Sequence, residues 1–243
     1  MYLKSLAVLT LTLLAVSPTF AGGASSNAAK TSGDSSYEGV YFGGNIGYVH
    51  SQTNVKHGGY NSGDGHDHEG QGPKDIALFI GKNWILDNIL FGTEMNVGFM
   101  NHDSSGQQPT FVGNANKVND SIARLRAGNY IDLSLRVGYI FENDYMAYFK
   151  FGLVETTMVN SYTDTNTSGL TLDSGTKSGN LSGGSMGFGI EKPISDSIQL
   201  RFSVNHYDMT TVRHTGIANN SDDYEFKHNN DITTYNIGFV HKF

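Results

Sequence analysis

The last residues of the chain alternate strictly between two kinds of side chain. One face of this extended segment carries mostly apolar and aromatic groups: Phe243, His241, Phe239, Ile237, Tyr235 and Thr233. The opposite face carries mostly small or polar groups: Lys242, Val240, Gly238, Asn236 and Thr234. This period of two, with apolar groups outside and small or polar groups inside, is typical of a strand in a transmembrane β-barrel.

Seven earlier segments show the same alternation, at residues 37–50, 75–85, 89–100, 130–141, 145–154, 181–191 and 197–207. Three connections between the segments are short, at residues 86–88, 142–144 and 192–196. Four are long and rich in Gly, Ser, Asn, Asp and Thr, at residues 51–74, 101–129, 155–180 and 208–230. Short turns at one end and long loops at the other predict an all-β fold, an eight-stranded antiparallel up-and-down transmembrane β-barrel. A soluble sandwich or lipocalin-like barrel, the alternative, would place the apolar residues inside and would not require this asymmetry.

The beginning of the chain has the features of a secretory signal peptide. The first residues carry one positive charge, residues 6–16 are almost entirely apolar, and Ala21 offers a small residue for cleavage. We predict that residues 1–21 form a signal peptide, which is too short to span a bilayer as a helix. Residues 22–36 are predicted to be a flexible periplasmic leader, and residues 37–243 the outer-membrane barrel domain.

Composition excludes several classes of function. The sequence has no cysteine, which rules out disulfides, thiolate metal sites and cysteine nucleophiles. The net charge of -7 and the pI near 5.6 argue against nucleic acid as a partner. Beyond the predicted signal peptide no apolar run is long enough to form a transmembrane helix. The mean hydropathy of -0.32 is compatible with a barrel, because barrel strands alternate apolar with polar residues.

Charges gather on one periodic face of the predicted strands. The candidates for this face are two acids and four bases: Glu94, Glu191, Arg136, Lys150, Arg201 and Lys242. A charge that faces lipid near mid-membrane costs ~2–4 kcal/mol, so this face is predicted to be the interior. An eight-stranded barrel is just wide enough for its own side chains, which predicts a salt-bridged plug. A narrow ion path or gate made from the same charges is the alternative. Lys82 is the exception on the outer face, near the periplasmic end, where its ammonium would reach the interface.

Several motifs resemble those of one family. Residues 37–48 read YEGVYFGGNIGY and resemble the W-x-G-x-Y-x-G-x-N-x-G-Y opening of alphaproteobacterial Omp25-like, opacity-type porins, with Tyr37 in place of Trp. Further matches follow in order: GKNW at 81–84, GTE at 92–94, SLRVGY at 134–139 and GFGIE at 187–191. The first of these has Lys82 where the family has Tyr. The resemblance covers residues 37–243.

The resemblance implies an eight-stranded, OmpA-like barrel in the outer membrane of a Gram-negative bacterium, displayed as a surface antigen. It also implies that the C-terminal residues are read by the barrel-assembly machinery. The candidates for this assembly signal are Tyr235, Ile237, Phe239 and Phe243. His241 occupies a position where the family usually has an apolar or aromatic residue.

The leading hypothesis for function is a non-enzymatic surface protein. The barrel would anchor four extracellular loops, where they would contact lipopolysaccharide or molecules of a host surface, in the manner of an adhesin, and it would contribute to envelope integrity. The alternative is a narrow channel for ions or small solutes.

Two further alternatives concern specific chemistry. His57, His66 and His68 lie in the first long loop and would offer imidazoles to a metal or to haem iron, but a solvated, variable loop explains them as well. No cofactor is therefore predicted. His206 is predicted outward near the extracellular rim, with Asp208 close by, which is compatible with a lipid A hydrolase. No H-x-S or H-x-T pair accompanies His206, so no catalytic residue is assigned.

Overall fold

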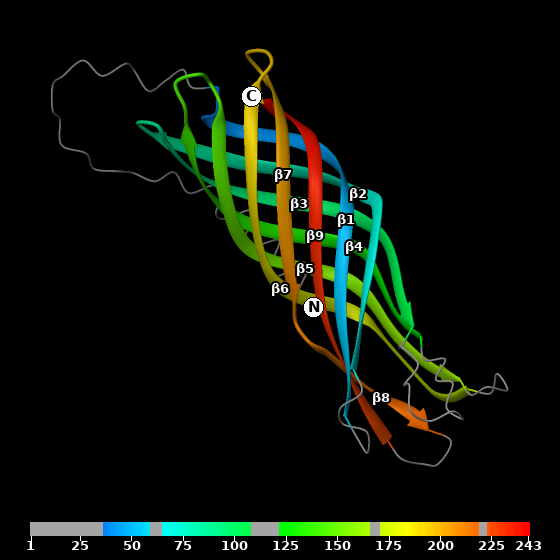
Figure 1. The fold of residues 1–243 in the computed structure, drawn as a ribbon. Coiled ribbons are helices and arrows are strands. Elements are labelled where there is room, and N and C mark those ends of the chain that lie inside the picture. The colour runs from blue at the N-terminus through cyan, green and yellow to red at the C-terminus, as the bar shows by residue number, and fades with distance from the viewer. Residues whose placement is uncertain (1–35, 59–64, 108–121, 166–170, 219–222) are drawn as a thin grey trace, which may run out of the picture.

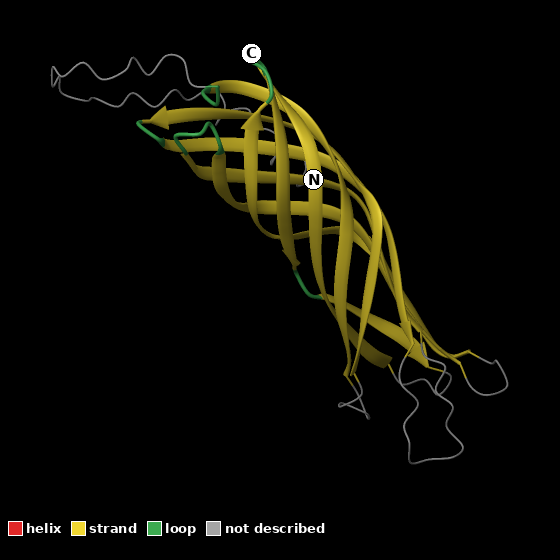
Figure 2. Ribbon diagram, turned by 45° about the horizontal axis from the view of Figure 1, so that its top comes forward, coloured by secondary structure: helices red, strands yellow, loops and turns green. Residues whose placement is uncertain are grey.

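The computed structural model describes residues 36–58, 65–107, 122–165, 171–218 and 223–243. The predicted signal peptide, and the leader apart from Ser36, lie outside these ranges. The regular structure of the described residues is β-strand (Figure 2). No helix capable of crossing a bilayer occurs in this part of the chain.

One antiparallel sheet contains all the strands, which are β1 (Gly39–Gly58), β2 (Gly65–Leu86), β3 (Ile89–Gln107), β4 (Ile122–Ile140), β5 (Met146–Thr165), β6 (Thr171–Pro193), β7 (Ile198–Met209), β8 (Val212–Ala218) and β9 (Asp223–Lys242). Each strand from β1 to β7 pairs with the next along the chain, β7 pairs with β9, and β1 pairs with both β2 and β9. The fold is therefore an up-and-down β-barrel, as the alternation predicted (Figure 1).

The described residues form nine strands, where the sequence predicted eight. The additional strand arises from a break after β7 at Thr210 and Thr211. The backbone N–H and the side-chain hydroxyl of Thr210 both donate to the carbonyl oxygen of Ser182, at 3.0 and 2.9 Å. Beyond the break, β8 lies between the same two neighbours, because it pairs with β9 and, over a short stretch, with β6.

The strands are much longer than predicted. β6 has 23 residues and β1 has 20. At ~3.3 Å per residue, a strand of the length of β1 spans roughly 66 Å. The apolar band of an outer-membrane barrel is only about 25 Å tall. The prediction that residues 51–74, 101–129, 155–180 and 208–230 are loops is therefore wrong for most of their described residues, which extend the sheet. Figure 1 shows the short turns and the C-terminus at one end of the molecule and these extensions at the other.

The polarity of the two sheet faces reverses along the strands. In the turn-proximal part, large apolar side chains point outward: Phe239 is 57 % exposed and Phe188 is 51 % exposed. In the extension, apolar side chains point inward, and Ile232 and Phe226 of β9 are fully buried. We call the first part the band region and the second the extension. The expectation of a small and polar interior holds only in part: large side chains such as Leu90, Met146 and Phe79 are buried in the band region as well, and the interior of the extension combines apolar with polar side chains.

A β-bulge in β4 helps to produce this reversal. The pairing of β4 with β5 shifts register between Ala127 and Tyr130, and both of these residues are buried although they are three positions apart. The additional residue exchanges the two faces of the strand. Beyond it Leu125 is fully buried, whereas Arg124 and Arg126 are exposed to water.

Inward glycines make room for aromatic rings inside the narrow barrel. Tyr41 lies directly opposite Gly81, and Tyr148 lies directly opposite Gly189 on the neighbouring strand. A Cβ atom at either glycine would collide with the facing ring. The glycines thus allow the rings to lie flat against the sheet, where their hydroxyl groups and faces meet the charged side chains described below.

Candidate functional site

Glu94 lies at the centre of a buried charge cluster in the band region. Its Oε2 accepts hydrogen bonds from the NH1 atoms of Arg201 and Arg136, at 2.8 and 3.3 Å. Its Oε1 lies 3.6 Å from the Nζ atom of Lys150. Glu191 Oε1 lies 2.7 Å from NH2 of both arginines, although for Arg201 NH2 the direction suits an ion pair and not a hydrogen bond. The five side chains come from β3, β4, β5, β6 and β7.

Asp132 completes the cluster and was missed by the sequence analysis. Its Oδ2 lies 3.0 Å from Lys150 Nζ, and its Oδ1 accepts a 2.6 Å hydrogen bond from Ser185. Asp132 lies two positions before the inward-facing Ser134 on the same strand, so the alternation would have identified it. With Asp132 included, three cations face three carboxylates, and the formal charges cancel.

Aromatic rings enclose the two arginines. The guanidinium carbon of Arg136 lies 3.9 Å from the ring centroid of Tyr148, and that of Arg201 lies 3.9 Å from the ring centroid of Phe79. The Tyr41 hydroxyl donates to Glu94 at 2.9 Å and accepts from Arg136. The charged side chains are at most 4 % exposed. The cluster is therefore a compact, buried group of paired charges.

Lys242 is the sixth residue predicted for this network. It is half-buried near the short-turn end, and its backbone N–H donates to the carbonyl oxygen of Ser197 at 2.9 Å. The ion pairs given above join the other five predicted residues and Asp132.

Apolar side chains fill the barrel on both sides of the charge cluster. At the short-turn end, Tyr37 packs with Leu90, Met146 and Tyr148, and its hydroxyl donates to the carbonyl oxygen of Asp144 at 2.8 Å. Toward the extension lies a larger group made of Val49, Ala77, Met100, Leu125, Ala127, Tyr130, Val154, Met158, Tyr207, Met209 and Ile232. The sequence analysis did not identify this group, and it assigned four of its eleven residues, Leu125, Ala127, Met158 and Met209, to loops.

The extension has its own core. Val55, Ala123, Tyr162 and Phe226 form a buried apolar cluster, in which the rings of Tyr162 and Phe226 lie 4.4 Å apart. Between this cluster and the larger apolar group lie buried polar side chains. There Thr53 donates to Asn230 at 3.0 Å.

The same polar layer contains a serine–histidine pair. Ser51 Oγ lies 2.7 Å from His102 Nε2, which is within the distance for a base-activated serine. Ser51 is fully buried and His102 is 2 % exposed, so a substrate has no access to this pair. We interpret it as a structural hydrogen bond that satisfies two polar groups inside the sheet.

The predicted loop histidines belong to strands. The backbone of His57 lies in β1, and those of His66 and His68 lie in β2, opposite Val55 and Thr53. Their side chains are outside the described part of the structure. Among the residues that are described, no group of three or more acidic or histidine side chains is arranged to hold a metal ion.

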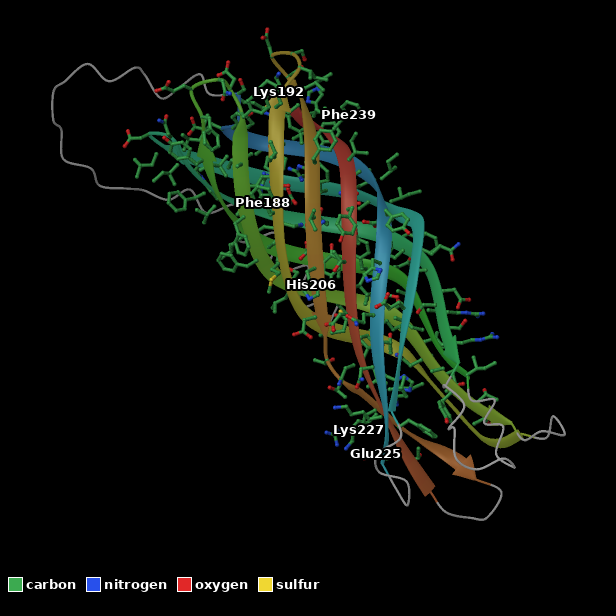
Figure 3. All side chains as sticks on the ribbon, viewed as in Figure 1. Phe188, Lys192, His206, Glu225, Lys227 and Phe239 are labelled. Atoms are coloured by element: carbon green, nitrogen blue, oxygen red, sulfur yellow. The ribbon has the colours of Figure 1, made fainter. Side chains whose placement is uncertain are left out.

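His206 lies on the outer face of β7, as predicted. Its Nδ1 is 3.1 Å from the hydroxyl oxygen of Thr233, and Asp208 is exposed two positions further along the strand. Figure 3 places His206 between the band region, marked by Phe188 and Phe239, and the extension, marked by Glu225 and Lys227. This is the boundary where a polar side chain would meet the edge of the lipid.

The C-terminal candidates face outward. Tyr235, Ile237, Phe239 and Phe243 are between 41 and 77 % exposed. The ring of His241 stacks on Phe42 of β1, with 5.2 Å between their centroids. His241 thus fills the position of the usual apolar residue with an aromatic contact across the pair of first and last strands. Lys82, on the outer face of β2, lies 5.3 Å from the centre of the Trp84 ring.

Comparison with known proteins agrees with this architecture. The family model of the outer membrane protein beta-barrel domain matches residues 8–243. The chain belongs to this family, and membership indicates the outer membrane of a Gram-negative bacterium. No protein with a curated description matches the chain.

Several solved barrels are similar at low sequence identity. The outer membrane protein OprG of Pseudomonas aeruginosa is 13 % identical with a TM-score of 0.51, and the match covers 85 % of this chain and 97 % of that chain. Ail, the attachment invasion locus protein of Yersinia pestis, is 11 % identical with a TM-score of 0.34, covering 82 % and 99 %. The outer membrane protease OmpT from Escherichia coli is 10 % identical with a TM-score of 0.40, covering 85 % and 97 %. At such identities the similarity shows the fold alone.

Proposed function

We propose that this protein is a non-conducting, non-enzymatic surface protein, whose rigid barrel holds a long extracellular β-sheet for interaction with molecules outside the cell. The observation that carries this proposal is the filled interior. The Tyr37 cluster, the charge cluster and two apolar clusters follow one another along the barrel. With the interior occupied, the large surface that remains for interaction is the outward face of the extension.

The proposal includes a closed barrel with eight strand positions, in which β7 and β8 occupy one position. The register of β1 with β9 over 18 residue pairs, from Tyr41–Lys242 to Gly58–Glu225, supports closure. Both β7 and β8 pair with β9, which supports counting them as one strand position in the barrel. We orient the extension toward the outside and the short turns toward the periplasm, because long segments of such barrels are extracellular.

The proposal also includes the export and the assembly of the protein. Residues 1–21 would direct secretion and be removed, and residues 22–36 would remain as a periplasmic leader. The outward row of Tyr235, Ile237, Phe239 and Phe243 would be read by the barrel-assembly machinery. Membership in the Omp25-like group of alphaproteobacteria remains a prediction from the motifs. The proposed partners are lipopolysaccharide around the barrel and molecules of a host surface at the extension.

A narrow channel is the second candidate. The charge cluster supports it, because exchange of ion pairs between Arg136 and Arg201 would be one way to move an ion past Glu94. Purified protein in a planar bilayer distinguishes the two functions. We expect no discrete conductance steps, and steps that change in an Arg136→Gln variant would replace our proposal with the channel.

The surface function is tested on cells. Antibody accessibility of a short epitope inserted at Gly179, in the outer part of β6, should equal that of a known surface marker in intact cells. The matched insertion in the short turn at Asn143 should become accessible only after the outer membrane is permeabilised. The opposite pattern would refute the orientation.

A further inference from the structure

Three cationic side chains form a row across the outward face of the extension. Lys56 of β1 lies directly opposite Lys227 of β9, and Lys227 lies directly opposite Arg213 of β8. All three point away from the barrel, since their neighbours Val55, Phe226 and Val212 are buried inside. With strands about 4.8 Å apart, the row is about 10 Å wide.

Residues on both sides of the row complete a small grid on β1, β9 and β8, together with Thr211 just before β8. Nearer the membrane band, the backbone register brings Asn54 and Asn229 opposite one another, and the Thr211 hydroxyl donates to Asn229 Oδ1 at 2.7 Å. Further from the band, Glu225 lies opposite Thr215. The grid therefore presents cations in the centre, with amide and hydroxyl groups on the side nearer the band and the Glu225 carboxylate on the other side.

Glu225 only partly compensates the three cations. Its carboxylate lies 3.4 Å from Arg213 NH1 and 3.4 Å from Lys227 Nζ. Asp231, on the same strand as Glu225, is four residues beyond Lys227, or about 13 Å along the strand. Within the grid itself three cations stand against one carboxylate, in a chain whose net charge is -7, and Asp67 of β2 lies opposite Asn54 in the register of β1 with β2, at the border of the grid.

A row of this kind works against stability. Like charges directly opposite one another on neighbouring strands are destabilising. Sequences at an exposed sheet face are free to vary, and Thr, Asn or Gln would satisfy the same positions without repulsion. The row is therefore better explained by an anion that binds it than by a requirement of the fold.

The surface behind the row is rigid. Val55, Phe226 and Val212 are 0 to 4 % exposed, and Phe226 packs against Tyr162 in the core of the extension. The backbone positions from which the three cationic side chains project are thus held at the spacing of the strands before a ligand arrives. Preorganisation of this kind reduces the entropy lost on binding.

We propose that this grid, Lys56, Lys227 and Arg213 with Asn54, Asn229 and Thr211, binds a sulfated polysaccharide chain outside the cell. Guanidinium and ammonium groups pair with sulfate oxygens, and the amides and hydroxyls suit the sugar hydroxyl groups. Lys227 lies eight residues beyond Tyr235, about 26 Å along β9, which is too far from the apolar band for the phosphates of membrane lipid. A single-stranded nucleic acid would need stacking rings, and the grid has none. The inference deepens the proposed surface function and rests on it for biological access.

The test uses the full mature chain, folded in zwitterionic detergent, so that it does not depend on orientation in the membrane. Binding of size-defined heparin is measured by calorimetry at several salt concentrations, with neutral dextran of the same length as the control. We expect heparin to bind, dextran not to bind, and the affinity to fall as salt rises. Absence of heparin binding would overturn the inference and leave the conductance and accessibility tests of the surface function unaffected.

Variants locate the site. The triple variant Lys56→Gln, Arg213→Gln and Lys227→Gln should bind heparin at least about tenfold more weakly. Arg124→Gln, which removes an exposed cation on β4, is the matched control and should bind as the unaltered protein does. The reverse result would place the binding site elsewhere and refute the assignment.

The variant Glu225→Gln tests whether a loss of heparin binding in the triple variant could come from misfolding. Removal of the grid's carboxylate should strengthen heparin binding several-fold, a gain that a misfolded protein would not show. Unchanged or weaker binding by this variant would contradict the grid. Equal affinity for heparin and for a single-stranded DNA of matched charge would refute the assignment to a polysaccharide.

Discussion

Phe226 and Phe239 lie on the same strand and have opposite surroundings. Phe239, in the band region, is 57 % exposed on the outer face, whereas Phe226, in the extension, is fully buried on the inner face. The charged residues show the inverse: Lys150 is buried inside the band region, and Lys56 is exposed on the outside of the extension. One continuous sheet therefore has two arrangements of polarity.

The difference follows from the solvent that surrounds each part of the sheet. In the band region the outer face meets lipid, so polar and charged groups turn inward and satisfy one another as ion pairs and hydrogen bonds. In the extension the outer face meets water, so the apolar groups turn inward and form a core as in a soluble barrel. The solvent, and not the sheet geometry, determines which side is apolar.

Removal of Glu94 should produce the largest effect, because it strips three buried cations of a shared partner. We expect Glu94→Ala to lower the free energy of unfolding by about 3–5 kcal/mol. Urea unfolding in lipid vesicles, followed by the fluorescence of the single tryptophan, Trp84, measures it. Glu225→Ala, which removes a partly exposed carboxylate from the extension, should cost about 1 kcal/mol or less. Equal losses would mean that the charge cluster does not support the band region.

A charge placed on the outer face should affect the folding free energy differently in the band region and in the extension. Ile237→Arg faces lipid and should cost ~2–4 kcal/mol of folding free energy near mid-membrane. Thr215→Arg is exposed on the extension and should be close to neutral. The yield of folded protein in vesicles and its unfolding free energy give the comparison. A comparable loss from Thr215→Arg would show that lipid also covers the extension.

A methyl group added to an inward glycine should disturb the charge cluster. Gly81→Ala would force the Tyr41 ring aside and weaken its hydrogen bond to Glu94. We expect a loss of about 1–3 kcal/mol, as for other overpacked interiors. Gly184→Ala is the control, since a Cβ atom there meets nothing within 4 Å. If both variants unfold at the same urea concentration, the close fit of Tyr41 against Gly81 is not required.

A single methylene should give the smallest measurable difference. Ile232→Val, inside the extension, leaves a void in a packed core and should cost about 0.5–1.5 kcal/mol. Ile237→Val, on the lipid face, should cost less, because lipid chains can fill the space. The two variants share strand, residue type and substitution. A larger loss for Ile237→Val would contradict a packed core in the extension.

The sequence was sufficient to predict the strands of the band region, because the alternation of side chains involves only residues close together in the chain. The alternation that ends at Phe243 assigned the lipid face of the last strand correctly, including His241. The same rule would have found Asp132, two positions from Ser134. It failed in the extension, where long stretches of Gly, Ser and Asn looked like loops although they pair as strands.

The bulge explains part of that failure. One additional residue between Ala127 and Tyr130 reverses the face of every residue beyond it. Leu125 then joins the interior, although an unbroken alternation from Arg136 would place it outside. Register shifts of this kind depend on the neighbouring strands and leave little trace in the strand itself.

The sequence by itself determined the class of fold, the lipid-facing residues and the identity of most of the buried charges, because alternation is a property of neighbouring residues. Only the tertiary structure decided which charges meet. Arg201 reaches Glu94 across 107 residues of chain. It also decided that Lys56, Lys227 and Arg213 stand in one row. Contacts of this kind depend on the register between strands and on the curvature of the sheet, which only the assembled barrel fixes.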